Sequence, residues 1–240
     1  MGRARAVAAI VAVVLICSAS LELHADQFVF NESFTTQALN NNLDSHRTDG
    51  FALNLTNGQA VMTQSSGVTS GYVNIFTKFQ LEGDFTATLT ASRSEGNTSS
   101  AGLEAYFNSS QFSDIYFVGT NSIYSNVYPS CCAIASISVP TATFRIERTG
   151  NTLIQQYDDG SGFITLRTAE DPAFGDPLLI SFFLTQEQGF SNSNTVSFDN
   201  LNITADGVLG FVAPVPEPSS ISLICISLPL FFFLRRSIGC

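Results

Sequence analysis

Tryptophan is absent from this sequence, and positively charged residues are scarce. Ten Lys and Arg stand against 20 Asp and Glu in 240 residues, and only 12% of the chain is charged. Four of the basic residues lie at the extreme ends, at Arg3, Arg5, Arg235 and Arg236, so residues 26–218 hold 19 acidic and 6 basic residues. A surface this acidic repels a phosphate backbone, so we expect no nucleic-acid partner.

The same middle region has few side chains for catalysis or metal binding. Its single histidine, His46, lies in the polar stretch NNNLDSHRTDG, without a Gly-x-Ser-x-Gly motif. We therefore expect no Ser-His-Asp site, and zinc needs more Cys and His than are present. No catalytic residue, metal or cofactor is predicted, with calcium as the one ion left open, since it needs only oxygen ligands. The oxygen donors considered for calcium, which ordinary turns explain equally well, are Asp158, Asp159, Asp199 and Asn200.

The five cysteines divide between the ends of the chain and one adjacent pair. Cys17, Cys225 and Cys240 lie in the terminal segments, whereas Cys131 and Cys132 lie in the stretch YPSCCAIAS. In an oxidising compartment, a vicinal disulfide between the adjacent pair is the simplest prediction. A bridge to another molecule is the alternative.

The N-terminus has the order of a secretory signal. Arg3 and Arg5 precede an apolar run over residues 6–17, and cleavage after Ala25 is compatible with the small residues there. A spanning helix needs about 20 apolar residues, so this run is short for one. We predict a cleaved signal peptide over residues 1–25, and an uncleaved anchor is the alternative.

The C-terminus reverses that order. Pro216-Glu217-Pro218 breaks regular structure, an apolar run follows over residues 221–234, and the pair Arg235-Arg236 comes next. As a helix this run would cover about 21 Å, and the long Arg side chains can help it cross a core of about 30 Å. Positive charge stays on the cytoplasmic side, which places the main domain outside. A helix buried in the fold and a glycolipid-anchor signal are the alternatives.

This tail resembles the PEP-CTERM sorting signal of Gram-negative bacteria. The resemblance covers residues 214–240, in the order VPEPS, short apolar helix and Arg pair, behind a signal peptide. It implies recognition by exosortase, a membrane protease-transpeptidase, and export to the cell surface or extracellular matrix. The residues that carry the implied signal are Pro216, Glu217, Pro218, Arg235 and Arg236.

The region between the ends has the alternation of short β-strands. Residues 85–92 (FTATLTAS) alternate apolar and Thr or Ser side chains, which is typical of a strand with one buried face. We predict a strand over residues 72–81 before it, joined by a turn at Glu82-Gly83-Asp84. Asn57-Gly58 between two further runs predicts a type I′ hairpin.

Three more segments complete this β pattern. Residues 143–168 predict a three-stranded meander with turns at 149–151 and 158–162. The continuously apolar residues 177–186 favour a central strand, and residues 194–204 predict an edge strand. About twelve strands at this spacing indicate one all-β antiparallel sandwich. The predicted domains are a signal peptide (1–25), a β-sandwich (26–205), a linker (206–215) and the sorting signal with its short transmembrane helix (216–240).

Residues 28–204 resemble the concanavalin A-like jelly rolls of secreted bacterial proteins. The resemblance rests on FNESF, LEGDFTATLT, SSAGLEAYF, FRIERTGNTLIQQYDDGSGF and SFDNLNIT. It implies glycan or protein binding, and in one branch hydrolysis of β-glucans. That branch has a Glu-x-Asp-x-x-Glu strand, which is not found: Glu82-Gly83-Asp84 is followed by Ala87 where the last Glu belongs. The pairs Asp158-Asp159 and Glu170-Asp171 are interpreted as turn or loop carboxylates.

Sugar binding needs aromatic rings, and the tyrosines are the candidates. They can line one face of the sandwich or pack in the core; they are Tyr106, Tyr116, Tyr124 and Tyr128. The first hypothesis is a non-enzymatic surface or matrix protein that binds polysaccharide, and a purely structural protein is a further alternative. The second is a divergent glycoside hydrolase or lyase, which needs two carboxylates within about 6 Å in a cleft.

Overall fold

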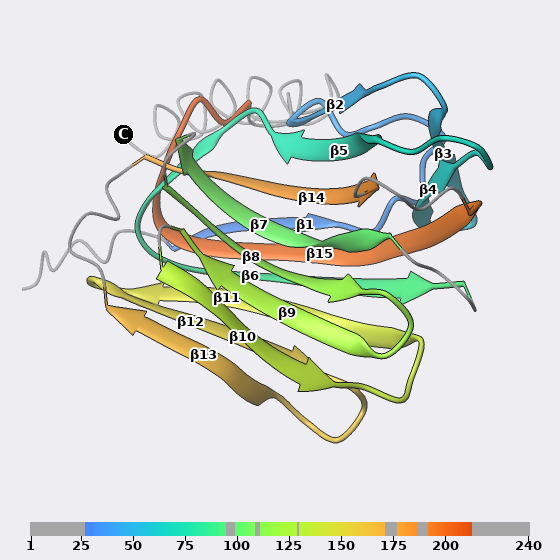
Figure 1. Ribbon diagram of the computed structural model, residues 1–240. Helices are drawn as coiled ribbons and strands as arrows, with labels where there is room; N and C mark the ends of the chain where they lie inside the picture. Colours follow the sequence, from blue (N-terminus) through green and yellow to red (C-terminus); the bar gives the residue numbers. More distant parts are fainter. Residues whose placement is uncertain are drawn as a thin grey trace, which may run out of the picture. The chain divides into compact units, whose positions relative to one another are not determined.

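A computed structural model describes residues 27–94, 99–108, 111–128, 130–170, 177–186 and 192–212. Within these residues the chain forms fifteen β-strands and no α-helix. The strands build two antiparallel sheets that pack face to face, which confirms the predicted all-β sandwich. In Figure 1, strands β5, β14, β7, β8, β9 and β10 lie in front of strands β15, β6, β11, β12 and β13.

The eight-stranded sheet holds the longest strands. Strand β1 (Phe28–Glu32) pairs with residues 201–205 of β15, whereas β4 pairs with residues 194–198 of the same strand. The other seven strands follow in spatial order as β13 (Ile164–Glu170), β12 (Thr152–Asp158), β11 (Thr141–Thr149), β6 (Gln80–Arg93), β15 (Asn194–Leu209), β4 (Gln59–Gln64) and β3 (Phe51–Thr56).

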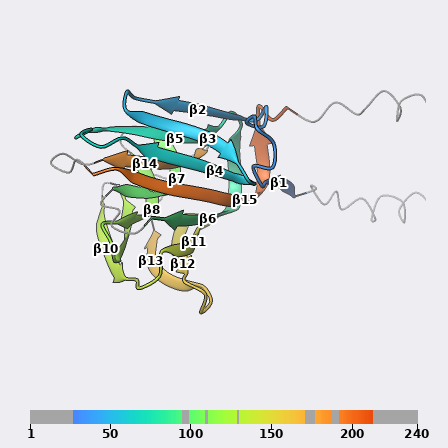
Figure 2. The same cartoon turned by 90° about the vertical axis from the view of Figure 1, so that its right-hand side faces the viewer.

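The seven-stranded sheet carries one face toward the core and one toward solvent. In spatial order its strands are β10 (Ser130–Ser136), β9 (Ser122–Val127), β8 (Gln111–Val118), β7 (Ser100–Asn108), β14 (Leu179–Gln186), β5 (Gly71–Thr77) and β2 (Leu43–Arg47). Its edge strand β10 and the edge strand β13 of the other sheet lie at the same end of the sandwich, lower in Figures 1 and 2.

Phenylalanine takes the place of tryptophan in the core between the sheets. Phe117 on β8 meets Phe144 on β11 edge to face, with ring centroids 4.9 Å apart. Phe182 on β14 meets Phe198 on β15 in the same way at 5.1 Å. All four rings are fully buried, and each pair joins one sheet to the other. The alternation of buried and half-buried residues along β6, β11 and β12 follows from this one-sided burial.

Several local predictions are confirmed. Asn57 and Gly58 connect β3 and β4 with φ angles of 53° and 75°, which a type I′ turn requires. Strands β11, β12 and β13 form the predicted meander. Strand β14 lies between β7 and β5, as its continuous apolar sequence predicts.

The turn predicted at Glu82-Gly83-Asp84 is wrong. Strand β6 runs through these residues, and the chain passes from β5 to β6 at residues 78–79 instead. Gly83 has a φ of 70° and lies in a bulge where β6 and β15 shift register. The buried guanidinium of Arg148 donates a hydrogen bond of 2.8 Å from Nε to the Gly83 carbonyl, and Gly150 N donates to Asp84 Oδ1 at 2.6 Å. The Arg148 side chain and the Gly150 backbone, both distant in sequence, therefore hold the bulge.

The edge strand predicted at residues 194–204 is also wrong. Strand β15 lies between β6 and β4 and continues past residue 205 to Leu209. Its alternation arises from a buried face and a half-buried face, and alternation does not reveal how many strands flank it. The predicted signal peptide and transmembrane helix lie outside the described residues. No helix in the described part of the chain is long and apolar enough to cross a membrane.

Candidate functional site

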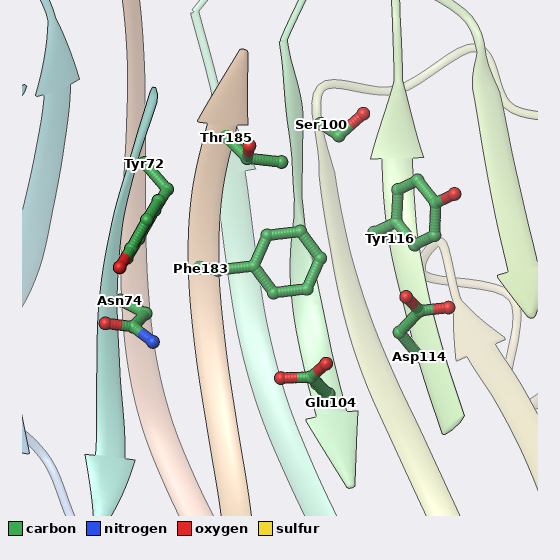
Figure 3. Close-up of a pocket in the computed structure, with 8 residues that line it drawn as sticks. All are labelled: Tyr72, Asn74, Ser100, Glu104, Asp114, Tyr116, Phe183 and Thr185. Atoms are coloured by element: carbon green, nitrogen blue, oxygen red, sulfur yellow. The ribbon is translucent and has the colours of Figure 1, made fainter. Parts of the chain in front are cut away.

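A pocket of about 310 Å³ opens on the solvent-facing side of the seven-stranded sheet. Strands β5, β14, β7 and β8 supply its lining, and Figure 3 shows the side chains projecting from these neighbouring strands. The lining residues are Tyr72, Asn74, Ser100, Glu104, Asp114, Tyr116, Phe183 and Thr185. They come together because residues two apart on a strand share a face, and antiparallel pairing aligns them with their partners.

One cross-strand row carries the acidic groups. Asp114 on β8 lies directly opposite Glu104 on β7, and Ser181 on β14 lies opposite Glu104 on its other side. Directly opposite residues have Cβ atoms about 4.5–5.5 Å apart, so the two carboxyl groups are neighbours. The Ser181 hydroxyl donates a hydrogen bond to Glu104 Oε2.

The adjacent row carries aromatic rings. Tyr116 on β8 and Phe183 on β14 both lie opposite Gly102 on the intervening strand β7. Their ring centroids are 5.9 Å apart. Gly102 makes this possible, because a Cβ there would lie 2.2 Å from the Ile115 carbonyl oxygen and 2.4 Å from Tyr116 Cβ. Because Gly102 has no side chain, the rings of Tyr116 and Phe183 meet across strand β7 at this point.

Tyr72 forms the side of the pocket toward the sheet edge. It lies opposite Thr185, which in turn lies opposite Ser100. The Tyr72 hydroxyl is 2.7 Å from Nδ1 of His46 on β2, a hydrogen bond that fixes the direction of the phenol ring. His46, expected in a polar loop, lies on an exposed edge strand and takes part in positioning this tyrosine.

Burial raises the pKa of both carboxyl groups above the usual range. It raises the pKa of Asp114 to about 8, and the nearby charge of Glu104 adds to the increase. Burial also raises the pKa of Glu104, which the Ser181 hydrogen bond partly opposes. Asp114 Oδ1 and Asn74 Oδ1 are buried and accept no hydrogen bond in the structure. The pocket therefore contains two acceptor atoms without donors, and one of them belongs to the carboxyl pair itself.

A residue of the opposite sheet supports the acidic row from below. Gln155 on β12 is fully buried, and its Nε2 lies 2.7 Å from the Asp114 carbonyl oxygen and 3.0 Å from that of Asn126. The same nitrogen lies 2.9 Å from Ser113 Oγ. These contacts hold the backbones of β8 and β9 from the core side of the sheet. They keep Asp114 in its buried position.

The four tyrosines considered in the sequence lie on the solvent-facing side of this sheet, and of these four only Tyr116 lines the pocket. Tyr124 lies next to it, with ring centroids 6.1 Å apart, and Tyr128 stacks on Phe112 beyond them. Tyr106 and Tyr128 are exposed. The alternative prediction was that these tyrosines pack in the core. The tyrosine that does pack there is Tyr157, which has 6% of its surface exposed.

The oxygen donors considered for calcium do not converge. Asp199, Thr90, Thr143 and Asp158 lie in register on four adjacent strands, which separates the two Asp residues by about 14 Å at 4.8 Å per strand. Asp158 Oδ1 accepts hydrogen bonds from Gly160 N and Gly162 N, as expected for a turn. No group of three or more His, Cys, Asp or Glu able to hold a metal ion occurs among the described residues.

The other predicted site residues stay predictions. Cys132 is disulfide-bonded, but the side chain of Cys131 lies outside the described residues, so the vicinal pairing is not established. The sorting-signal residues Pro216, Glu217, Pro218, Arg235 and Arg236 also lie outside them.

The two sheets, their strand order and the shared core define a concanavalin A-like β-sandwich. No family model and no curated protein sequence matches this chain. Similar solved structures include an endo-β-1,3-glucanase from Pyrococcus furiosus, with a TM-score of 0.60 and 10% identity over 73% of this chain and 93% of that one. SCLam, a non-specific endo-β-1,3(4)-glucanase of family GH16, gives a TM-score of 0.58 and 10% identity over 75% and 94%.

A third similar structure is the GH43 protein BlXynB from Bacillus licheniformis, with a TM-score of 0.56 and 11% identity. The match covers 73% of this chain but only 39% of that protein. At these identities the similarity establishes the fold alone.

Proposed function

We propose that this protein is exported to the cell surface or extracellular matrix and binds polysaccharide there without catalysis. The observation that carries the proposal is the combination in one open pocket of aromatic rings with hydrogen-bonding groups. Tyr72, Tyr116 and Phe183 offer apolar surface for a sugar ring, and Glu104, Asp114 and Asn74 offer polar atoms for its hydroxyls. Sugar sites typically combine these two kinds of surface.

Tyr116→Ala is expected to weaken binding to a recognised polysaccharide about tenfold or more, because stacking and burial of the ring are lost together. Affinity electrophoresis of the full-length protein through gels containing neutral β-glucans measures this change. The matched control is Tyr128→Ala, which removes an exposed tyrosine of the same face outside the pocket. Equal retardation of the wild type and Tyr116→Ala would contradict the proposed site.

The pair Glu104 and Asp114 favours a second candidate, a glycoside hydrolase. Retaining enzymes place two carboxyl groups about 5–5.5 Å apart and keep one of them protonated. Directly opposite strand positions and a raised Asp114 pKa are compatible with both requirements. Release of reducing ends from β-glucans by the wild type, abolished in Glu104→Gln, would favour the enzyme over the binding protein.

Export is proposed from the terminal segments. A signal peptide over residues 1–25 directs secretion, and an exosortase-type enzyme recognises residues 216–218 and processes the tail. The transient transmembrane helix holds the protein at the inner membrane during sorting, with the sandwich outside. Intact-mass analysis of the exported protein tests both cleavages, and a mass equal to that of the full chain would refute them.

A further inference from the structure

The open side of the seven-stranded sheet is acidic, and its described strands carry one basic residue besides His46. Among the described strands of this sheet, the only Lys or Arg is Arg47 on the edge strand β2. Strands β5 and β14 separate β2 from β7, and Arg47 is in register with Ala101, so Arg47 lies more than about 14 Å from Glu104 at 4.8 Å per strand. The other described basic residues belong to the eight-stranded sheet or to the β5–β6 connection. The Glu104–Asp114 pair therefore has no cationic partner within the described strands of this sheet.

The hydrogen bonding around this pair also leaves specific acceptors open. Glu104 receives the Ser181 hydroxyl, whereas Asp114 Oδ1, in a residue only 8% exposed, receives nothing. Across the pocket, the buried Asn74 Oδ1 receives nothing either. Figure 3 shows both groups facing the same pocket. A buried acceptor without a donor is costly, so a ligand that brings several N–H donors gains from filling this space.

The aromatic lining fits the same kind of ligand. The rings of Tyr72, Tyr116 and Phe183 border the pocket beside the carboxyl groups. The faces of such rings attract ammonium groups and also stack on sugar rings. An ammonium group carries three donors and a positive charge, which satisfies the carboxyl pair and the open acceptors together.

We propose that the ligand is a cationic polysaccharide, one whose amino sugars carry free, protonated amino groups, and that the Glu104–Asp114 pair binds the ammonium. This inference rests on the proposed function and specifies its ligand class. The sugar ring lies against the aromatic residues, and the ammonium lies between the two carboxyl groups and Asn74.

The raised pKa of Asp114 supports this assignment and predicts a pH dependence. A bound cation favours the ionised carboxyl groups, so affinity for the amino sugar rises with pH as these groups ionise and falls once the amine loses its own proton. Strand β14 contributes no titratable group to this face. Besides Asp114, the titratable side chains on the solvent-facing side of the described strands of this sheet are Asp44, His46, Tyr72, Glu104, Tyr106, Tyr116 and Tyr124.

Three β-1,4-linked hexamers that differ only at C2 test the proposal, namely those of glucosamine, N-acetylglucosamine and glucose. Titration calorimetry with the full-length protein in mild detergent at pH 6.5 measures the three affinities. The glucosamine hexamer is expected to bind at least about tenfold more tightly than either of the other two hexamers. Asp114→Asn and Glu104→Gln are expected to remove this preference, so that each variant binds the glucosamine hexamer no more tightly than it binds the neutral hexamers. Asp44→Asn, which removes a charge at the exposed edge of the same sheet, is expected to keep it.

The outcomes separate the inference from the proposed function. Binding of the neutral hexamers without preference for glucosamine would overturn the inference alone, whereas binding of none of the three would overturn both. Loss of the preference in Asp44→Asn as well would show that the preference arises from the overall negative charge of this face and not from the Glu104–Asp114 pair. Competition by 1,4-diaminobutane as strong as that of the glucosamine hexamer would show that no sugar is required. Loss of binding in a chelator would assign the pair to a metal ion, and either result would also overturn the proposal.

Discussion

Gly102→Ala is expected to destabilise the sandwich by about 3 kcal/mol or more, and to abolish the pocket in whatever fraction still folds. The added Cβ would lie 2.2 Å from the Ile115 carbonyl oxygen and 2.5 Å from Tyr116 Cα. Both are backbone atoms of the paired strand β8, so no side-chain rotation can relieve the contact. Strands β7 and β8 would have to separate at the centre of the sheet, and the rings of Tyr116 and Phe183 would move with them.

Urea unfolding of the full-length protein measures this loss, and Gly207→Ala is the matched control. Gly207 is also in a long strand, β15, but a Cβ there would meet nothing closer than Glu82 Cβ at 3.4 Å. Its replacement is expected to change the free energy of unfolding by about 0.5 kcal/mol or less. Similar losses for the two variants would mean that the close approach of β7 and β8 is not as the structure describes it.

Asp114→Asn is expected to stabilise the protein increasingly as pH rises. The pKa of Asp114 is raised to about 8 in the folded state and is near 4 in the unfolded chain, so the folded state holds a proton that the unfolded chain releases. This contribution to stability is fully present below about pH 4 and is lost as pH rises through 8. Its upper limit is about 6 kcal/mol, since one pKa unit corresponds to about 1.4 kcal/mol. Asparagine does not ionise and therefore avoids the loss.

Thermal unfolding between pH 4.5 and 9 tests this dependence. The melting temperature of Asp114→Asn is expected to exceed that of the wild type by about 10 °C at the alkaline end, and by little at the acidic end. Asp44→Asn removes the same charge from an exposed position and is expected to follow the wild-type curve. A constant difference between Asp114→Asn and the wild type would show that Asp114 ionises normally in the fold.

The sequence was informative where the physical cause of a structure is local. Asn57-Gly58 supplies the positive φ angles of a type I′ turn, and the meander over residues 143–168 has a turn of Gly, Asn or Asp at each reversal. The bulge at Gly83 was misread because its stabilising groups, Arg148 and Gly150, are more than sixty residues away. The neighbouring sequence does not distinguish a glycine in a β-bulge from a glycine in a turn.

The candidate site could be predicted only in part. Tyr116 was among the tyrosines considered either for one face or for the core, but Tyr72 and Phe183 reach the pocket from strands distant in sequence. The search for a carboxyl pair along single strands missed Glu104 and Asp114, because these two residues meet across a strand pair. Alternation along each strand places both on the solvent-facing side, but strand order and register, which the sequence alone does not reveal, make them neighbours.

A crystal structure of the protein with a bound oligosaccharide tests the central claim most directly. We predict a sugar ring against Tyr116 and Phe183, with its polar groups at Glu104, Asp114 and Asn74. An oligosaccharide bound on the eight-stranded sheet, or at the loops that end the sandwich, with this pocket empty, would contradict the assignment of the polysaccharide site.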